Sequence, residues 1–469
     1  MGIARRLWRA FDDRAGISQI LGPVLRHPVP KDARWYYVFG SATLFAFLLQ
    51  VVTGIALALA YIPSTANAYD TLQWITHQAP FGRILRGMHY FGASAMVLLI
   101  GAHMARTFLM GAYKFPRELN WITGVILFIV TILLAFTGQL LRWDQTAVWS
   151  IAVAAEQMGR LPLIGRALAR FLLAGDTWGG QTLSRFFAFH VFFIPAVIFA
   201  FVGIHLWLVL RHGISEPPEP GRPVDPRTYR AWYQSLLSRE GRPFWPDAAW
   251  RDIVFGVCMA GAVVLASLIV GPPELGKPPD PTIIQADPRP DWYLLWYFGL
   301  LALLPPNLEN YVMVLGPLVA LIVLLLVPAV SNRGERSPAR RPWAIGAVFA
   351  ICLMIGTLWI VGARAPWSPD FTTGPIPARI TGAATGPVAE GGRLFYDKGC
   401  QYCHAIAGYG GARGPDLSAV GDRLTPAQMT WRILNGGTNM PAFAGNLTPD
   451  QLDALVAFLK SRSAGVSPP

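Results

Sequence analysis

Charged residues are scarce in this 469-residue chain: they make up 14% of it, against 53% hydrophobic residues. Soluble domains carry about 25% charged residues, so the composition excludes an ordinary soluble protein. Several apolar stretches approach the ~20 residues that a bilayer-spanning helix needs. Seven are expected as spans: 36–62, 84–108, 121–141, 186–210, 252–270, 310–330 and 343–362. The expected fold is therefore all-α, a polytopic membrane helix bundle.

Cysteine is also scarce, and the four present exclude a disulfide framework. Cys258 and Cys352 stand alone in apolar stretches and are interpreted as packing residues. Cys400 and Cys403 belong to CQYCH, a C-x-x-C-H motif whose thiols bind haem covalently while His404 becomes an axial ligand. A zinc site would need further Cys or His residues that this region lacks. The motif therefore predicts a small helical cytochrome c domain.

The sixth ligand of that haem is expected to be a methionine. Met429 lies in a helical pattern, whereas Met440 lies in NMPAF, a context that resembles small class I cytochromes c, so Met440 is the predicted ligand. Residues 363–388 are rich in Pro, Gly, Ala and Thr and indicate a linker. The domain then occupies 389–469. Its terminal helices are expected at 390–398 and 449–461.

Histidine is rare as well: the chain has eight, and four lie inside apolar stretches. His89 and His103 are in the second span, and His190 and His205 are in the fourth. An intramembrane histidine is costly and indicates function; a helix–helix hydrogen bond would explain a single one better than two matched pairs. Steps of 14 and 15 residues rise by ~21 Å and ~22 Å and return to nearly the same helix face. Two such helices can therefore hold two haems by bis-histidine ligation.

The basic residues predict the orientation of the chain. Residues 1–14 indicate a basic amphipathic helix on the inner membrane surface, and the loops after spans two, four and six are basic, as the positive-inside rule requires. Loop 142–185 is also basic yet falls outside, and it is expected to be partly helical. Seven crossings place the C-terminal domain outside, where covalent haem attachment takes place. The net charge of +12 follows from these loops, and nucleic-acid binding is not expected.

The orientation assigns the histidines to haems. Spans two and four both run inward, so His89 pairs with His190 at the outer haem and His103 with His205 at the inner one. Arg86 and Arg106 lie three residues to either side of the span-two pair. They either neutralise haem propionates or are ordinary snorkelling arginines.

Four glycines repeat the 14-residue spacing. Gly40 and Gly54 lie in span one, and Gly124 and Gly138 in span three. Close packing of membrane helices is one explanation; the other is that a flat macrocycle needs a surface without side chains. Gly54 and Gly138 are assigned to the outer haem and Gly40 and Gly124 to the inner haem.

Four segments carry a resemblance to a known family: RGMHYFGASAMVLLIGAHMAR, KFPRELNWITG, GGQTLSRFFAFH and HLWLVLRHGISEPP. They resemble the cytochrome b of quinol–cytochrome c reductases, the Rieske/cytochrome b family. The resemblance covers 1–362 and implies a four-helix two-haem core at 1–215 and a three-helix part at 216–362. The seven spans and the 15-residue step are similar to the plastid-type branch, where these parts are separate chains. Val38 stands where that branch has a haem-tethering cysteine, so a covalent extra haem is not expected.

The same resemblance implies two quinone sites. PDWY, with Asp in place of the family's Glu, marks the quinol-oxidation site, where a carboxylate can accept the quinol proton; its residues are Pro290, Asp291, Trp292 and Tyr293. Arg142 stands where the family has Pro, and it is expected to reshape the floor of this pocket. Three residues are candidates for the quinone-reduction site or are simply interfacial charges: His212, Arg251 and Asp252.

The implied function is the core subunit of a proton-translocating quinol–cytochrome c oxidoreductase in a bacterial plasma membrane, with two haem b, one haem c and bifurcated electron flow. A Rieske cluster needs two Cys and two His, and none are left, so a separate Rieske protein is an implied partner. Quinol, membrane lipid, a cytochrome c-type acceptor and a second copy of the complex complete the expected partners. A terminal oxidase would need more histidines. A linear conduit from quinol to the periplasm remains the alternative: the PDWY motif argues against it, but the haem ligands do not.

Overall fold

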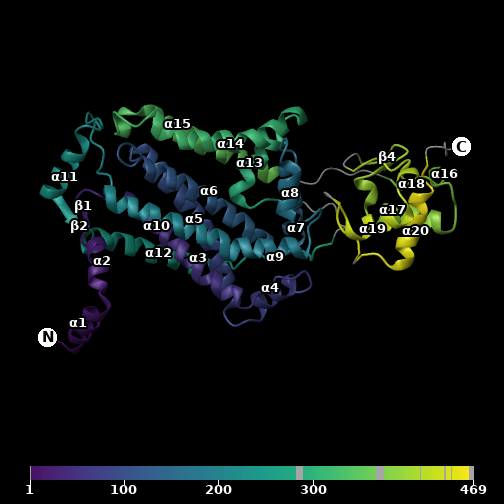
Figure 1. Ribbon diagram of the computed structural model, residues 1–469, viewed down its shortest axis with the longest axis horizontal. Helices are drawn as coiled ribbons and strands as arrows, with labels where there is room; N and C mark the ends of the chain where they lie inside the picture. Colours follow the sequence, from purple (N-terminus) through teal and green to yellow (C-terminus); the bar gives the residue numbers. More distant parts are fainter. Residues whose placement is uncertain are drawn as a thin grey trace.

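The computed structural model is an elongated bundle of long helices with a small helical domain beyond one end (Figure 1). It describes residues 2–280, 289–365, 374–411, 414–437, 440–444 and 446–463. Within these ranges, seven helices are long and apolar enough to cross a membrane, which confirms the all-α polytopic fold. Residues 366–373 of the predicted linker lie outside the described residues.

The spans follow the apolar stretches of the sequence closely. In chain order they are α3 (Phe39–Ala58), α5 (Gly82–Leu109), α6 (Glu118–Leu140), the continuous run α9 (Gly180–Ala188), η2 (Phe189–Phe193) and α10 (Ile194–His212), then α12 (Ala249–Ile269), α14 (Pro306–Val330) and α15 (Pro342–Arg364). Many large hydrophobic side chains on these helices face outward. A bilayer solvates such surfaces, whereas water does not.

Four helices form the centre of the bundle. α3 packs along α5 and α6 packs along α10, while α12 covers α3 and α5. Between the two pairs lies a buried cluster of Ala46, Phe47, Met96, Ile194 and Ile198. Each buried aliphatic or aromatic side chain contributes roughly 1.5–3 kcal/mol in water, but in a membrane the gain comes from close packing. α14 and α15 lie on the far side, with α14 against α6.

Buried cations cap several spans at the end where the N-terminus lies. Lys114, Arg117 and Arg341 are each 5% exposed or less. They donate to carbonyls at the C-terminal ends of α14, α10 and α5, at 2.6 to 3.2 Å. A cation there satisfies orphan carbonyls and opposes the helix macrodipole. The concentration of basic residues at this end therefore has a structural cause as well as a topological one.

Short elements cover the same end. The predicted amphipathic helix at 1–14 forms as α1 (Ile3–Ala15), with Leu7, Trp8 and Phe11 exposed. The other elements here are α2 (Ile17–Leu25), η1 (Trp35–Tyr37), α11 (Tyr229–Glu240), η3 (Phe244–Ala248), η4 (Pro338–Arg340) and an antiparallel pair of β1 (Pro28–Pro30) with β2 (Gly241–Pro243).

The opposite end carries α4 (Ala68–His77), α7 (Gln145–Gly159), α8 (Gly165–Leu173) and α13 (Trp292–Ala302). Loop 142–185 is thus partly helical, as predicted. Asp144 begins α7 because its carboxylate accepts the backbone N–H of Ala147 at 2.9 Å. The short apolar helix α13, which packs against α15, was not anticipated from the sequence.

The C-terminal domain comprises α16 (Ala378–Thr381), α17 (Pro387–Asp397), η5 (Cys400–Tyr402), β3 (Ala405–Ile406), β4 (Tyr409–Gly410), α18 (Val420–Arg423), α19 (Pro426–Asn435) and α20 (Pro449–Lys460). α17 and α20, the predicted terminal helices, cross closely, with the Phe395 and Phe458 ring centroids 5.8 Å apart. Capping boxes at Thr425 and Thr448 begin α19 and α20.

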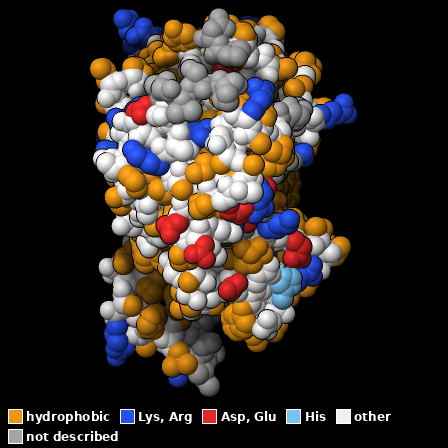
Figure 2. Space-filling view, turned by 90° about the vertical axis from the view of Figure 1, so that its right-hand side faces the viewer, with side chains coloured by type: hydrophobic (Ala, Val, Ile, Leu, Met, Phe, Trp, Pro, Cys, Tyr) orange, Lys and Arg blue, Asp and Glu red, His pale blue; other side chains and the backbone are white. Residues whose placement is uncertain are grey.

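This domain lies beyond α7 and α8, at the end of the bundle opposite the N-terminus (Figure 1). Asn446 Nδ2 donates to Asp280 Oδ1 at 3.0 Å, which joins the domain to the chain after α12. Figure 2 views this end, where acidic and basic side chains are scattered among uncharged ones. The visible face therefore does not indicate an acceptor of one strong charge sign.

Candidate functional site

The structure brings the four span histidines together in the pairs that the sequence predicts. The rings of His89 on α5 and His190 on η2 lie with their centroids 6.1 Å apart and their planes at 80° to each other. His103 and His205 interact electrostatically at the other level of the same four helices. Within the described residues, no group of three or more His, Cys, Asp or Glu side chains could hold a metal ion.

A π-helical turn explains why the two histidine steps differ by one residue. His190 lies within η2, the π-helix at Phe189–Phe193. A π-turn accommodates one extra residue inside an α-helix and often occurs at functional sites. The 15-residue step from His190 to His205 therefore matches the 14-residue step of α5.

Three threonines contact the histidines, and sequence analysis did not identify them. Thr53 Oγ1 lies 3.0 Å from His89 Nδ1, Thr137 Oγ1 lies 3.2 Å from His190 Nδ1, and Thr123 Oγ1 lies 2.9 Å from His205 Nδ1. Each threonine immediately precedes one of the predicted haem glycines. In the part of the chain that the structure describes, the buried His103 Nδ1 has no hydrogen-bond partner, and Phe39 occupies the corresponding position before Gly40.

The four glycines lie directly against the imidazoles. A Cβ added at Gly138 would lie 2.6 Å from His190 Cε1, and one at Gly54 would lie 3.2 Å from His89 Cε1. A Cβ at Gly40 would lie 3.0 Å from His103 Cε1, and one at Gly124 would lie 3.6 Å from His205 Cε1. The bundle therefore keeps a side-chain-free surface beside each histidine, which fits a flat macrocycle.

The two predicted propionate arginines differ. Arg106 stacks over the ring of Tyr37, 3.7 Å from its centroid. Within the described residues, its Nε and one terminal nitrogen are buried without a well-aligned hydrogen bond, as are the hydroxyls of Tyr37 and Ser215. Leaving one such group unpaired costs about 1–3 kcal/mol, and more for a charged group. The N-terminal level of the bundle therefore fits an additional anionic group such as a propionate.

Arg86 already has protein partners. It donates to Thr76 Oγ1 at 2.9 Å and to the Pro273 carbonyl at 2.8 Å. Its assignment to a propionate stays a prediction. The Pro273 contact also ties α5 to the chain that follows α12.

The Asp291 segment lies beside the His89 level. Trp292 Nε1 donates to Ser94 Oγ on α5 at 3.2 Å, and Tyr90 interacts electrostatically with Asp291. Asp291 begins α13 but makes no side-chain capping bond. Its Oδ2 instead accepts the Tyr293 hydroxyl at 3.1 Å. A carboxylate with spare acceptor capacity thus stands near the predicted outer haem level, and Pro290 precedes it.

The electrostatics of this segment suit proton transfer. Burial raises the pKa of the Asp291 carboxyl, while the Tyr293 hydrogen bond and the charge of Arg142 oppose that rise. Burial and the neighbouring Asp291 charge raise the pKa of Tyr293 well above its usual value. Tyr293 therefore stays protonated and acts as a donor, whereas the Asp291 carboxylate is the group that can accept a proton.

Arg142, the departure from the family pattern, belongs to a turn that holds the chain leading toward this site. Its backbone N–H donates to the Gln139 carbonyl at 3.3 Å, a bond that proline cannot make. Its side chain is ion-paired with the fully buried Asp144. Asp144 also accepts the Gly276 N–H at 3.0 Å. The effect on the floor of a quinol pocket stays a prediction.

The candidates at the N-terminal end are only partly brought together. Asp252 Oδ1 accepts the Ser41 hydroxyl at 2.7 Å, next to Gly40 at the His103 level. Arg251 donates to the Ala33 carbonyl at 3.2 Å. The His212 carbonyl accepts from Arg117 at 3.2 Å, at the end of α10. Ser41 was missed because its role depends on a partner 211 residues away.

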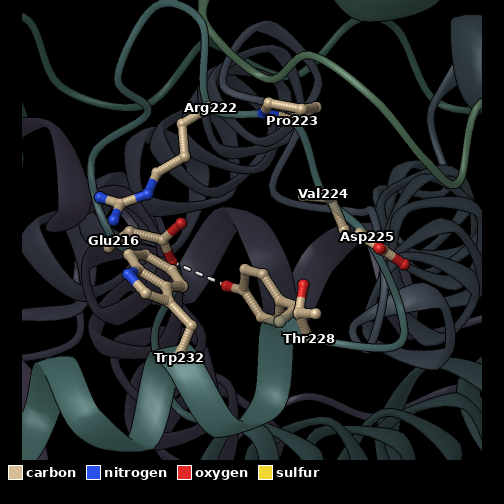
Figure 3. A pocket seen from close by; sticks show the side chains of 8 residues that line it. Glu216, Arg222, Pro223, Val224, Asp225, Thr228 and Trp232 are labelled. Carbon is tan, nitrogen blue, oxygen red and sulfur yellow. Dashed lines mark hydrogen bonds between the residues drawn. The ribbon is translucent and has the colours of Figure 1, made fainter.

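A cavity of about 300 Å³ lies at the same end, over α11. Figure 3 shows Glu216 and Arg222 at its wall beside Trp232, with a hydrogen bond from Tyr229 to Glu216 at 2.7 Å. Ligand pockets are mostly apolar with few polar groups, whereas three of the residues that line this cavity, Glu216, Arg222 and Asp225, are charged. It is therefore not assigned to quinone.

The C-x-x-C-H segment forms a short 3-10 turn, η5, followed by His404. His404 Nδ1 lies 2.8 Å from the Pro415 carbonyl, so this nitrogen donates and Nε2 is left free to ligate. A Cβ at Gly414 would lie 2.5 Å from the His404 ring. Met429 is 2% exposed in the domain core, whereas Met440 lies in the chain after α19. Met440 as the sixth ligand stays a prediction.

Comparisons with known proteins agree with this geometry. Residues 94–279 match the family described as cytochrome b (N-terminal)/b6/petB, and residues 278–380 match cytochrome b (C-terminal)/b6/petD. The menaquinol:cytochrome c reductase cytochrome b subunit of Geobacillus thermodenitrificans is 39% identical over 221 residues, which are 45% of this chain and 98% of the relative. The chain belongs to the cytochrome b family.

Other relatives extend the assignment. Cytochrome b of Rickettsia bellii (strain RML369-C) is 30% identical over 76% of this chain and 87% of its own length, which shows both membrane parts joined. A solved structure titled "Hyperthermophilic respiratory Complex III" has a TM-score of 0.64 and 27% identity, covering 84% of this chain and 95% of that one. Residues 387–459 match the family described as cytochrome C oxidase, cbb3-type, subunit III.

This cytochrome b is thus a membrane electron-transfer subunit of an oxidoreductase, with a cytochrome c domain at its C-terminal end. The two kinds of domain imply haem b and haem c. The match to the cbb3-type subunit III family covers residues 387–459, which lie in the C-terminal domain.

Proposed function

We propose that this cytochrome b is the core of a proton-translocating quinol–cytochrome c oxidoreductase with two haem b and one haem c. The observation that carries the proposal is the pair of histidine levels in one four-helix core, with Asp291 beside one level. His89 and His190 would hold the outer haem b, and His103 and His205 the inner one. Haem c would be held by Cys400, Cys403, His404 and Met440.

Asp291 is the proposed base in quinol oxidation. Its carboxylate has acceptor capacity left after the bond from Tyr293, so it can take a proton from a quinol hydroxyl. Tyr293 keeps its own proton and orients the carboxylate. Trp292 fixes the segment to α5 through Ser94, which keeps the base beside the outer level.

Bound haem supplies one-electron carriage, so one electron of quinol can go to a Rieske protein and haem c while the other goes through the two b haems to quinone. At the inner side, Asp252 and Ser41 are the proposed proton-handling pair, with Arg251, which directly precedes Asp252, and His212 as further candidates. Protons released outside and taken up inside would store the energy.

The proposed organisation has four parts: the two-haem core at 1–215, the three-helix part at 216–362, the linker at 363–388 and the cytochrome c domain at 389–469. The last part of the proposed linker, with α16, packs into the core of the C-terminal domain. The cation-capped end faces the cytoplasm of a bacterial cell, and the cytochrome c domain lies outside the plasma membrane. A separate Rieske protein, a cytochrome c-type acceptor, surrounding lipid and a second copy of the complex are the proposed partners.

The alternative is a linear conduit that carries both quinol electrons outward without a Rieske partner. The same histidine levels would serve it. The cytochrome c domain favours the linear conduit, because a single chain would then carry both the membrane haems and the haem that passes electrons to an outer acceptor.

Purification of the native complex in mild detergent tests the proposal. The expected optical spectra show two haem b for each haem c, with an iron–sulfur signal by electron paramagnetic resonance. The double variant C400S/C403S is expected to lose covalent haem on a denaturing gel and to keep both b haems. One haem b per chain, or an active complex without iron–sulfur, would contradict the bifurcating form.

A further inference from the structure

Three predicted haem ligands receive the same support from the helix that faces them. Thr53, Thr123 and Thr137 each stand one residue before a glycine that touches the supported ring. Their Oγ1 atoms lie 2.9 to 3.2 Å from Nδ1 of His89, His205 and His190. One helical position, repeated three times, thus serves three histidines.

The direction of these hydrogen bonds follows from the threonine hydroxyls. Each hydroxyl has one hydrogen, and each donates it to a carbonyl in the preceding turn: Leu49 at 2.7 Å, Leu119 at 2.8 Å and Leu134 at 2.8 Å. With its hydrogen on the carbonyl, Oγ1 accepts from the imidazole, and this direction requires the proton on Nδ1. Nε2 is then the free nitrogen.

His190 gives independent support for this tautomer. Its Nδ1 also lies 3.0 Å from the Leu134 carbonyl, which can only accept. His103 differs, because its buried Nδ1 has no hydrogen-bond partner and Phe39 stands where the other three sites have threonine. Both histidines of the predicted outer pair thus have a threonine partner, whereas only one histidine of the predicted inner pair has one.

We propose that Thr53, Thr123 and Thr137 are positioning residues that fix the Nδ1–H tautomer of three haem ligands and lower the reduction potential of the haem that each one serves. The inference rests on the proposed haem ligation. A hydrogen bond accepted from Nδ1–H makes Nε2 a stronger donor, and a stronger axial donor favours ferric iron. Outer-haem potential therefore depends on two threonines and inner-haem potential on one.

Valine variants test this inference because valine keeps the shape and removes the hydroxyl. Equilibrium redox titration of the purified complex, followed in the haem b absorption bands, gives both potentials. T53V and T137V are each expected to raise the outer-haem potential, and T123V the inner one only. A tenfold change in the ferric-to-ferrous ratio, the expected size, corresponds to about 59 mV for one electron. The double variant T53V/T137V should shift further than either single variant.

Two matched controls lie on the same helices. Thr131, on α6 between Thr123 and Thr137, is 3% exposed and its hydroxyl has no partner. Thr43, on α3, donates only to the Phe39 carbonyl at 2.8 Å. T131V and T43V should leave both potentials unchanged, and the serine variants T53S, T123S and T137S should restore the original values.

The outcomes separate this inference from the proposed function. Valine variants that keep both b haems and titrate like T131V would overturn the inference. Loss of a haem in a valine variant but not in its serine counterpart supports it, whereas loss in both counts against it. Failure of the proposed function would show earlier, as an unaltered complex without two b haems.

Discussion

Asp291→Asn is expected to slow quinol oxidation by about 10²- to 10⁴-fold, the usual contribution of a positioned general base. Asparagine keeps the size of the side chain and can still accept the Tyr293 hydroxyl, so the segment should keep its shape. It cannot take up the quinol proton. The measurement is the rate of haem b reduction by quinol in the purified complex.

The rate of quinol oxidation should depend on pH through the protonation of Asp291. Burial raises the pKa of Asp291, and only the ionised carboxylate can accept a proton. The rate should therefore fall as the pH drops through this raised pKa, at a higher pH than for an ordinary aspartate with a pKa of about 3.9. The acid limb of the profile should disappear in Asp291→Asn.

Asp291→Glu is the matched control, because it restores the carboxylate of the family signature. It should retain most of the rate and keep an acid limb. Near-normal quinol oxidation in Asp291→Asn would show that another group is the base.

Gly138→Ala is expected to remove the outer haem b and with it quinol oxidation. Alanine in a helix interior is favoured over glycine by about 0.8–1.0 kcal/mol, so the substitution alone should not weaken α6. A Cβ at this position would lie only 2.6 Å from His190 Cε1, which forces the imidazole away from His89. Optical haem b content and the redox titration check the result.

The glycines offer a graded set of controls. Gly124→Ala should be milder, because its Cβ would lie 3.6 Å from His205. Gly203→Ala, on α10 between His190 and His205, meets nothing within 4 Å and should leave both haems in place. Equal haem loss in Gly203→Ala would mean that the glycines act through helix packing in general.

Most of the membrane fold was predictable from the hydropathy of the sequence and the spacing of its histidines. The seven spans were predictable because each is a local apolar run. The histidine levels were predictable because helical rise and angle are fixed per residue. The π-turn at His190 was not predictable, since the spacing alone allows an ordinary helix to end near the same face.

Contacts between segments that are distant in the sequence were harder to predict. The Ser41–Asp252 pair joins residues 211 apart, and no local pattern marks it. The difference between Arg86 and Arg106 depends on which carbonyls and hydroxyls surround each guanidinium. The threonines were missed although their signal is in the sequence: a Thr-Gly dipeptide at three of the four predicted haem glycines.

The most direct measurement is oxidant-induced reduction in the purified complex. Quinol is present, the inner quinone site is blocked, and a pulse of oxidant is added. If quinol is oxidised beside Asp291 and its two electrons take different routes, the b haems become more reduced while haem c is oxidised. If the b and c haems are oxidised together, bifurcation is refuted and the chain is a linear conduit.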